Sequence, residues 1–285
     1  LAQRREKSYS FTTTASLGFR PWQGGEFYFD PEAAQGVPLS GLTGLGGFTN
    51  GEIARTAGPN LKVYRARAFL RQTWATGDEG EWVGSGADQL AGFVPRRRLV
   101  LTAGNFSLLD VFDDNAYSHD ARTQFLNWSL MTHGAYDYAA DARGYTWGAA
   151  LEWYHDDWVL RAGRALQPRL PNQLALDPAI GRHYGDQVEV GIGINVEQAV
   201  SDHVGVFLRA SRADGQTEAY AFTEIDNSFS GGLLLQGNGW GRARDTAGIA
   251  MARNGLSAAH AGYLASGGLG FFLGDGRLSY RAEEI

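Results

Sequence analysis

The sequence predicts an all-β chain that folds as a transmembrane antiparallel β-barrel. Segments in which apolar and polar residues alternate recur along most of the chain. Short turns and long connections join these segments in alternation, and aromatic residues gather at the segment ends. A membrane barrel combines these features, because each strand separates lipid from a lumen and its aromatic residues lie at the membrane interfaces.

The composition narrows the class of protein further. The chain has 285 residues, of which 39 are glycine and 8 are proline, with no cysteine and a mean hydropathy of −0.28. No continuous apolar run approaches the length of a membrane helix, which excludes a helical membrane protein and leaves a barrel open. The absence of cysteine suits an extracytoplasmic protein without disulfides. The net charge of −6 argues against a nucleic-acid partner.

The connections between the predicted strands differ in length on the two sides. Short turns close hairpins at 20–23, 155–156, 198–202, 239–244 and 274–276, and a β-sandwich would instead mix loop lengths between its ends. The connection 76–96 is long but falls on the short-turn side, and the pattern gives no reason for it. The long connections are 31–60, 107–143, 166–183, 214–226 and 255–263. The predicted strands are 8–19, 24–30, 61–75, 97–106, 144–154, 157–165, 184–197, 203–213, 227–238, 245–254, 264–273 and 277–285.

Both ends of the chain differ from what a whole barrel requires. The first residues, LAQRR, do not form a signal peptide, since no apolar region follows the positive charges. The last residues, RLSYRAEEI, end in the middle of a predicted strand. We therefore expect a single barrel domain over residues 1–285 that lacks strands at both ends.

Within most strands, alternate residues are apolar and polar. In 184–197, Val188 and Val190 lie on the face opposite Gln187 and Glu189. In 144–154 the apolar face carries tyrosine, tryptophan, alanine and leucine, whereas 97–106 and 245–254 allow either assignment of faces. The aromatic residues expected at the membrane interfaces are Tyr9, Phe19, Trp74, Tyr145, Trp153 and Trp158.

Three arginines in the predicted strand 61–75 bear on whether its two faces meet water and a protein core or a channel and lipid. In LKVYRARAFLRQTW (61–74), a period of two places Arg65, Arg67 and Arg71 on one face and an apolar, aromatic row on the other. In a soluble sandwich the arginines would face water and the apolar row a core. In a membrane barrel the arginines would line the channel and the apolar row would meet lipid. The residues of this strand alone leave both readings open.

Two segments resemble the carbohydrate-selective porins of Gram-negative outer membranes, the OprB family. They are FYFDPEAAQGVPLSGLTGLGGFTNGE (27–52) and GNFSLLDVFDDNAYSHDARTQFLNWSL (104–130), in which Ala121 replaces an expected proline. The similarity continues through RAGRALQPRLPNQLALD (161–177) to GDGRLSYRAEEI (274–285). The resemblance implies a sixteen-stranded barrel that passes sugars by diffusion, with about twelve strands in this chain and the closing strand absent from it.

Given this resemblance, the arginine row is expected to face a water-filled lumen. A guanidinium is a permanently charged, rigid fork of donors that can bind adjacent sugar hydroxyls. Carboxylates would accept from the same hydroxyls, and Trp128, Tyr117 or Phe69 would offer flat apolar surfaces to sugar C–H groups. The alternative is that the charges merely pair across the wall. The residues expected to line the pore or bind sugar are Arg65, Arg67, Arg71, Glu26, Asp113, Asp114, Asn115, Arg122, Trp128, Glu152, Arg161 and Glu189.

The connection 107–143 is the best candidate for a constriction. It is long and dense in groups that bind polyols, so folding into the channel mouth would narrow the pore and set its selectivity. The alternative is an external lid with internal salt bridges. The acidic run from Asp110 to Asn115 offers oxygen ligands for Ca²⁺, but its spacing is not that of an EF-hand. We expect capping and salt bridges to Arg122 instead.

The sequence therefore predicts an outer-membrane porin for mono- and small oligosaccharides, without enzymatic activity, cofactor or metal. Its partners would be sugars, outer-membrane lipid and lipopolysaccharide, and the barrel would be a monomer or a trimer. The alternative, from another class, is a secreted all-β domain that binds or hydrolyses carbohydrate. A glycosidase needs two carboxylates facing each other across the scissile bond, and the sequence shows neither such a pair nor a nucleophile motif.

Overall fold

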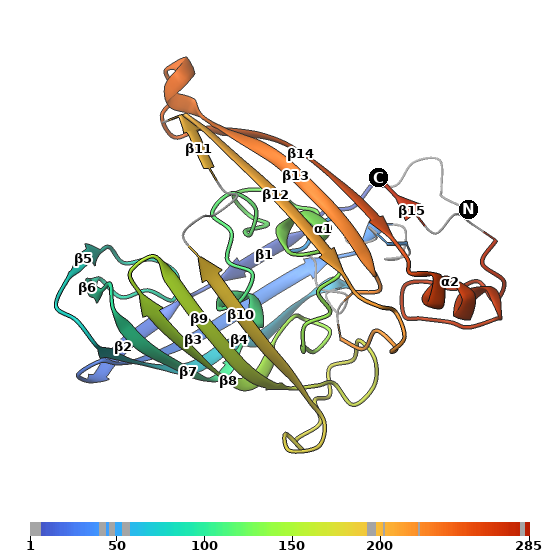
Figure 1. Ribbon diagram of the computed structural model, residues 1–285, viewed down its shortest axis with the longest axis horizontal. Coiled ribbons are helices and arrows are strands. Elements are labelled where there is room, and N and C mark those ends of the chain that lie inside the picture. Colours follow the sequence, from blue (N-terminus) through green and yellow to red (C-terminus); the bar gives the residue numbers. More distant parts are fainter. Residues whose placement is uncertain are drawn as a thin grey trace.

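Two antiparallel sheets form the wall of the molecule and face each other across a folded connection (Figure 1). The computed structural model describes residues 7–39, 44–45, 49–52, 58–192, 198–201, 203–221, 223–279 and 283–285. The first sheet has the order β1-β3-β4-β7-β8-β9-β10, with β2 also paired to β3. Its strands are β1 (Phe11–Thr14), β2 (Leu17–Trp22), β3 (Gly25–Gly36), β4 (Gly58–Ala75), β7 (Arg98–Phe106), β8 (Thr146–His155), β9 (Trp158–Leu166) and β10 (Tyr184–Ile192).

The second sheet has the order β11-β12-β13-β14-β15, and a separate hairpin pairs β5 with β6. The strands of the second sheet are β11 (Gln198–Ser201), β12 (Val204–Arg212), β13 (Asn227–Gln236), β14 (Thr246–Gly255) and β15 (Glu283–Glu284), and those of the hairpin are β5 (Gly80–Val83) and β6 (Gly92–Pro95). The helical segments are η2 (Leu108–Asp110), α1 (Trp128–Met131), η3 (Gly237–Trp240) and α2 (Ala258–Ala265). In the described part of the chain, no helix is long and apolar enough to cross a membrane.

The strands predicted between residues 24 and 254 are present, with β10 ending at Ile192 and 193–197 outside the described residues. The predicted strand 8–19 is divided into β1 and β2, and β2 continues to Trp22, into the predicted turn 20–23. Two predictions near the end of the chain are wrong. The predicted turn 198–202 contains β11, and the predicted strand 264–273 contains the end of α2 followed by irregular backbone. Ser257 caps α2 by accepting from the amide of His260, and three glycines between 267 and 270 interrupt any strand. Of the predicted strand 277–285, the structure shows only β15.

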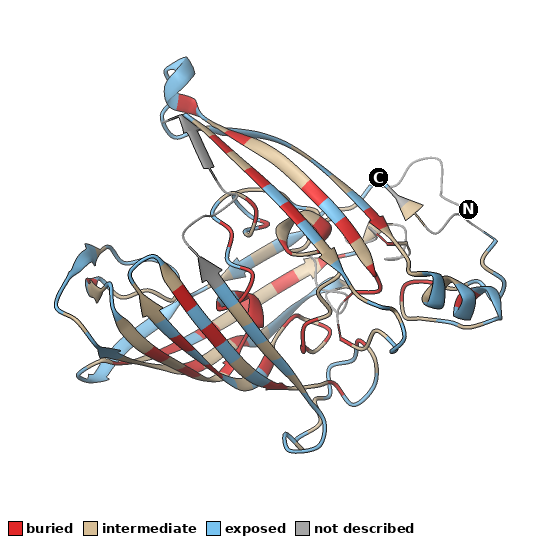
Figure 2. Cartoon of the chain, in the orientation of Figure 1, coloured by how far each residue is buried: buried red, intermediate tan, exposed pale blue. Residues whose placement is uncertain are grey.

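Burial alternates along the wall as the sequence predicts (Figure 2). In β8, Trp147, Leu151 and Trp153 are between 42 and 44% exposed, whereas Ala150 and Glu152 are buried. The sequence allowed either assignment of faces for 97–106 and 245–254, and the structure decides both. Val100 points inward in β7, and Ile249 points outward in β14. One face of the sheets is therefore exposed and mostly apolar, although the ion pair of Arg164 and Asp186 also lies on it, and the other face is covered.

A β-bulge in β4 breaks the period of two within the arginine row. Asp30 pairs with Arg67, but the next residue of β3, Pro31, pairs with Arg65, so Ala66 has no partner. Proline has no amide to donate to the ladder, which is why an extra residue is accommodated at this position. The bulge moves Arg65 to the outer face.

The connection between β7 and β8 packs inside the wall and supplies the core. Its apolar residues contact inward side chains of the first sheet, and its later part contacts the second sheet, where the ring of Phe125 lies 5.7 Å from that of Phe207. The first core cluster joins this connection to the wall through Tyr28, Phe69, Phe106, Leu108, Leu109, Val111, Phe112, Tyr138, Ala139, Ala140, Ala150 and Ala165. This packing places the connection against the inner face of the wall, and its role as a constriction stays a prediction.

Candidate functional site

The inner face of the first sheet carries a dense set of charged side chains. Alternation in β3 and β4 directs carboxylates and guanidinium groups inward from neighbouring strands, and β8, β9 and β10 add further charges. The inward charged residues of these strands include Glu26, Asp30, Glu32, Arg67, Arg71, Glu152, Arg161 and Glu189. Most are ion-paired, so the site is best described by its pairs.

Arg161 is the centre of one group, which we call the Arg161 cluster. Its side chain is 8% exposed, and its guanidinium lies 3.1 Å from the Glu152 carboxylate and also pairs with Glu189. A carboxylate oxygen of Asp114 lies 3.9 Å away. Asp114 belongs to the connection between β7 and β8, which was predicted at 107–143 and spans 107–145 in the structure. Tyr154 donates to Glu152 at 2.6 Å. Three adjacent strands and the inserted connection thus meet at one arginine.

A second group lies around Glu26 of β3 and Arg71 of β4, which are opposite each other in the strand register. Arg20 binds the Glu26 carboxylate through two nitrogens, at 3.0 and 2.8 Å, and Tyr28 donates to the same carboxylate at 2.7 Å. Arg71 donates to the carbonyl of Asp88 at 2.7 Å. We call Arg20, Glu26 and Arg71 the Arg71 cluster.

The connection predicted at 76–96, for which the sequence pattern gave no reason, spans 76–97 in the structure and provides the contact of Arg71 with Asp88. Its middle part folds against the inner face of the wall and is held there at several points. Arg20 donates to the carbonyl of Ala91 at 2.9 Å, and the amide of Leu90 donates to Tyr28 at 3.2 Å. The β5–β6 hairpin extends from this anchored segment. Both 76–97 and 107–145 therefore occupy the interior.

Arg67 joins the two inserted connections to the wall. Two of its nitrogens donate to Asp110 at 2.7 Å each, while Asp88 lies at 3.5 Å and Asp30 at 3.6 Å. Asp110 comes from 107–145, Asp88 from 76–97 and Asp30 from β3. One guanidinium thus faces three carboxylates.

This crowding changes the ionisation of Asp88. Burial is the largest cause of a rise in the pKa of its carboxyl group to about 7; Arg67 opposes the rise, and the Asp30 and Asp110 carboxylates add to it. Asp88 also has a positive φ of 51°, and its amide donates to Ser16 at 3.1 Å. The tip of the connection 76–97 is held in a conformation that few non-glycine residues adopt.

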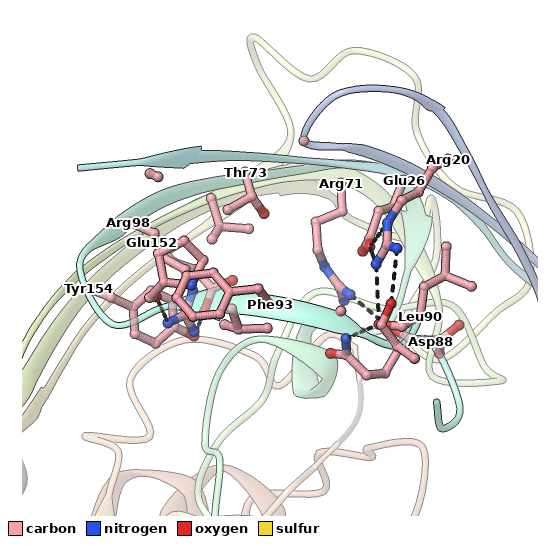
Figure 3. A pocket seen from close by; sticks show the side chains of 18 of the residues that line it. Arg20, Glu26, Arg71, Thr73, Asp88, Leu90, Phe93, Arg98, Glu152 and Tyr154 are labelled. Atoms are coloured by element: carbon pink, nitrogen blue, oxygen red, sulfur yellow. Dashed lines mark hydrogen bonds and ion pairs between the residues drawn. The ribbon is translucent and has the colours of Figure 1, made fainter. Parts of the chain in front are cut away.

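A cavity of about 750 Å³ lies between the two clusters (Figure 3). Arg71 and Glu26 border it on one side, and Glu152 with Tyr154 on the other. Arg98 stacks on Tyr154, with its guanidinium carbon 3.6 Å from the ring centroid. The walls thus offer donors and acceptors in close alternation, which suits an uncharged, hydroxyl-rich solute.

A third polar group is centred on Arg122, which lies in the connection between β7 and β8. Arg122 binds Glu52, donates to Thr14 at 2.9 Å and lies 3.4 Å from Glu32. Tyr145 was expected on the outer face, and this expectation is wrong. Its ring contacts Tyr64 and the guanidinium of Arg67, because it precedes β8 and does not share that strand's alternation.

Some predicted site residues do not line the lumen. The β4 bulge places Arg65 on the outer face. There Arg65 donates to Asn105 at 3.0 Å, and its guanidinium carbon lies 5.1 Å from the ring centroid of Trp147. Trp128 is 1% exposed and Phe69 is 2% exposed, both within core clusters, so neither offers a surface to sugar. Tyr117 packs on Gly205 of the second sheet.

Two further residues of the connection 107–145 have structural contacts. Asp113 is buried and pairs with Arg209 of β12 at 3.1 Å, and Asn115 accepts from the amides of Tyr117 and Ser118. The expected salt bridges to Arg122 are absent among the contacts of the described acidic run, where Asp110 pairs with Arg67 instead. In the described residues, no group of three or more histidine, cysteine or acidic side chains is arranged to hold a metal ion.

Several residues of the cavity were not predicted from the sequence. Asp88 and Phe93 lie in the connection 76–97, whose unusual length was the one available signal. Arg20 lies in the predicted turn 20–23 and Arg98 near the start of the predicted strand 97–106, and exposure to solvent is the simpler expectation for an arginine at the end of a strand. Five of the predicted site residues do line the cavity, namely Arg71, Glu26, Asp114, Glu152 and Arg161.

Comparison with known proteins identifies the family. The sequence profile of the carbohydrate-selective porins, OprB family, matches residues 6–177 and 186–271. The high-pH structure of Pseudomonas putida OprB is similar in fold, with a TM-score of 0.59 and 12% sequence identity over 90% of this chain and 71% of that chain. Among curated proteins, none matches this chain. The chain therefore belongs to the OprB family of carbohydrate-selective porins, β-barrels of the Gram-negative outer membrane.

Proposed function

We propose that monosaccharides and small oligosaccharides diffuse through this chain along the cavity between the Arg71 cluster and the Arg161 cluster. The chain acts as a single barrel domain over residues 1–285, with its apolar face against outer-membrane lipid and lipopolysaccharide. The observation that carries the proposal is the pairing of charges around a 750 Å³ cavity. Ion-paired walls leave little net field, so they admit neutral polar solutes without holding ions tightly.

The contacts of Arg71 support its role as a sugar-binding group. One nitrogen donates to the carbonyl of Asp88, and the guanidinium borders the cavity, so its other donors are available to a solute. Arg67 is less suited, because three carboxylates surround it. Sugar binding must remain weak, since a tightly bound solute would block its own passage.

The two inserted connections support a limit on solute size. The connections 76–97 and 107–145 both contact the inner face of the wall, and together they reduce the width available to a solute. Neither contributes a pair of carboxylates that we assign to catalysis. We therefore propose diffusion without chemical change.

Reconstitution into liposomes tests the proposal. Swelling rates should be high for monosaccharides, lower for disaccharides and near those of protein-free vesicles for long oligosaccharides. Labelled disaccharide recovered from the far side should be intact. Equal swelling rates for all sizes would contradict the inserted constriction, and recovery of cleaved sugar would replace diffusion by hydrolysis.

A further inference from the structure

The β5–β6 hairpin carries two aromatic side chains on one face. Trp82 and Phe93 are opposite each other in the hairpin register, so they share a face. Trp82 is 78% exposed and Phe93 46% exposed, and both border the cavity. By contrast, the exposed rings of Trp147 and Trp153 lie on the outer face of the wall. The hairpin instead presents its pair to a polar space.

The position of Phe93 is fixed by its surroundings. Its ring lies over Gly80, where a Cβ atom would come within 2.7 Å of the ring. The guanidinium of Arg98 donates to the carbonyl of Pro95 at 2.8 Å, and the amide of Arg96 donates to the carbonyl of Glu79 at 2.7 Å. The hairpin is thus tied to β7 and closed at its base, which orders the backbone that carries Phe93 before any solute arrives.

The polar groups near Phe93 lie to either side of its ring. Figure 3 shows Phe93 between Arg98, Glu152 and Tyr154 on one side and Arg71 with Asp88 on the other. A pyranose ring has one or two faces of C–H groups and a rim of hydroxyls. Such a solute can place a C–H face on an aromatic ring while its rim reaches donors and acceptors at the edges.

We propose that Phe93, with Trp82 beside it, is a stacking platform for pyranose sugars in the channel. The platform rests on the proposed function and adds to it a selectivity for ring sugars. An acyclic polyol such as sorbitol offers the same hydroxyls but no flat C–H face. The platform therefore favours ring sugars over open-chain polyols, whereas the charged clusters serve both.

Current block in planar bilayers tests the platform with glucose and sorbitol as probes. The unmodified protein should bind glucose more tightly than sorbitol. Phe93→Ala should raise the dissociation constant for glucose by about three- to tenfold and leave that for sorbitol unchanged, because only stacking is lost. Phe93→Tyr keeps a flat ring and should retain glucose block. Trp82→Ala should have a smaller effect of the same kind.

Two controls separate the outcomes. Phe229→Ala removes an aromatic ring that is 53% exposed on the second sheet and is not part of the cavity lining, so it should leave both constants unchanged. Ion conductance of each variant reports an intact channel. Equal changes for glucose and sorbitol in Phe93→Ala, or no change for either, would overturn the platform while sugar passage continued. If the unmodified protein were neither blocked nor crossed by any sugar, the proposed function itself would fail.

Discussion

Arg65 and Arg71 stand on the same strand, an even number of residues apart, yet they point to opposite faces of the wall. Arg71 borders the cavity, and Arg65 contacts Asn105 and Trp147 on the outer face. The cause is the unpaired Ala66, which lies opposite the step from Asp30 to Pro31. Two arginines of equal intrinsic chemistry thus meet different surroundings, which makes them a matched pair for experiment.

Arg71→Ala should weaken sugar block, whereas Arg65→Ala should not. The first change removes charge-assisted donors from the cavity, worth about 1 kcal/mol in a hydrated pore, so the dissociation constant should rise about fivefold. Arg71→Lys keeps the charge but loses the fork, so it should preserve ion selectivity and still weaken sugar block. Titrations of current block with glucose provide the measurement. Equal effects of Arg65→Ala and Arg71→Ala would contradict the assignment of faces.

Most of the wall could be predicted from the sequence, because alternation and turn length are local. The alternation of apolar and polar residues predicts which residues of β8 and β10 share a face. The resemblance to the OprB family predicts that these strands form a barrel. The bulge could not be predicted in the same way. Its cause, Pro31, lies on the neighbouring strand, and the register between β3 and β4 is not visible in either strand alone.

The roles of individual site residues were harder to predict, because a side chain's type does not reveal its partners. Asp113 and Trp128 have the chemistry of sugar-binding groups. However, Asp113 is buried against Arg209, and Trp128 is buried in an apolar cluster with Ile225 and Leu264. The connection 76–97 carries Asp88 and Phe93, and only its length marked it. Long-range packing decides which polar and aromatic groups remain available to a solute.

A positive charge on the outer face of β10 should prevent barrel assembly. Val188 is 76% exposed on that face, and its neighbour Gln187 points inward. Val188→Arg would place a guanidinium in lipid at a cost of about 2–4 kcal/mol near mid-membrane, whereas Gln187→Arg adds a charge to a hydrated interior. The heat-dependent shift in gel mobility that folded barrels show would measure assembly. Similar yields of folded protein from both variants would reverse the inside and outside of β10.

The buried pair of Asp113 and Arg209 should hold the connection 107–145 between the two sheets. The side chain of Arg209 is 3% exposed, and it also donates to the carbonyl of Leu130 at 3.0 Å. Arg209→Met would leave the Asp113 carboxylate buried without this partner, at a cost of about 3–5 kcal/mol. We expect faster proteolysis within 107–145 and a larger ion conductance.

Arg242→Met is the control for the loss of an ion pair. Arg242 pairs with Asp245, but its side chain is 72% exposed, and surface pairs contribute about 0–1 kcal/mol. This variant should keep the proteolysis pattern and conductance of the unmodified protein. If Arg209→Met behaved in the same way, the connection would have to be held by its apolar contacts alone.

The docking of the connection 76–97 should weaken as the pH rises. The groups facing Asp88 are Arg67 and the carboxylates of Asp30 and Asp110, and the carboxyl pKa is raised from 3.8 to about 7 when the segment is docked. A raised pKa means that the docked state retains a proton that the released segment has lost. Docking is therefore strongest below about pH 4, weakens progressively up to about pH 7, and changes little above that.

Limited proteolysis and ion conductance at about pH 5 and about pH 8 measure this dependence. The segment around Asp88 should be cleaved faster, and the channel should conduct more, at the higher pH. Asp88→Asn removes the titration and cannot acquire the extra negative charge beside Asp30 and Asp110, so the variant should resist cleavage equally at both values. Asn also tolerates the positive φ at this position, which avoids new backbone strain. A pH dependence that survived in Asp88→Asn would assign the effect to other groups.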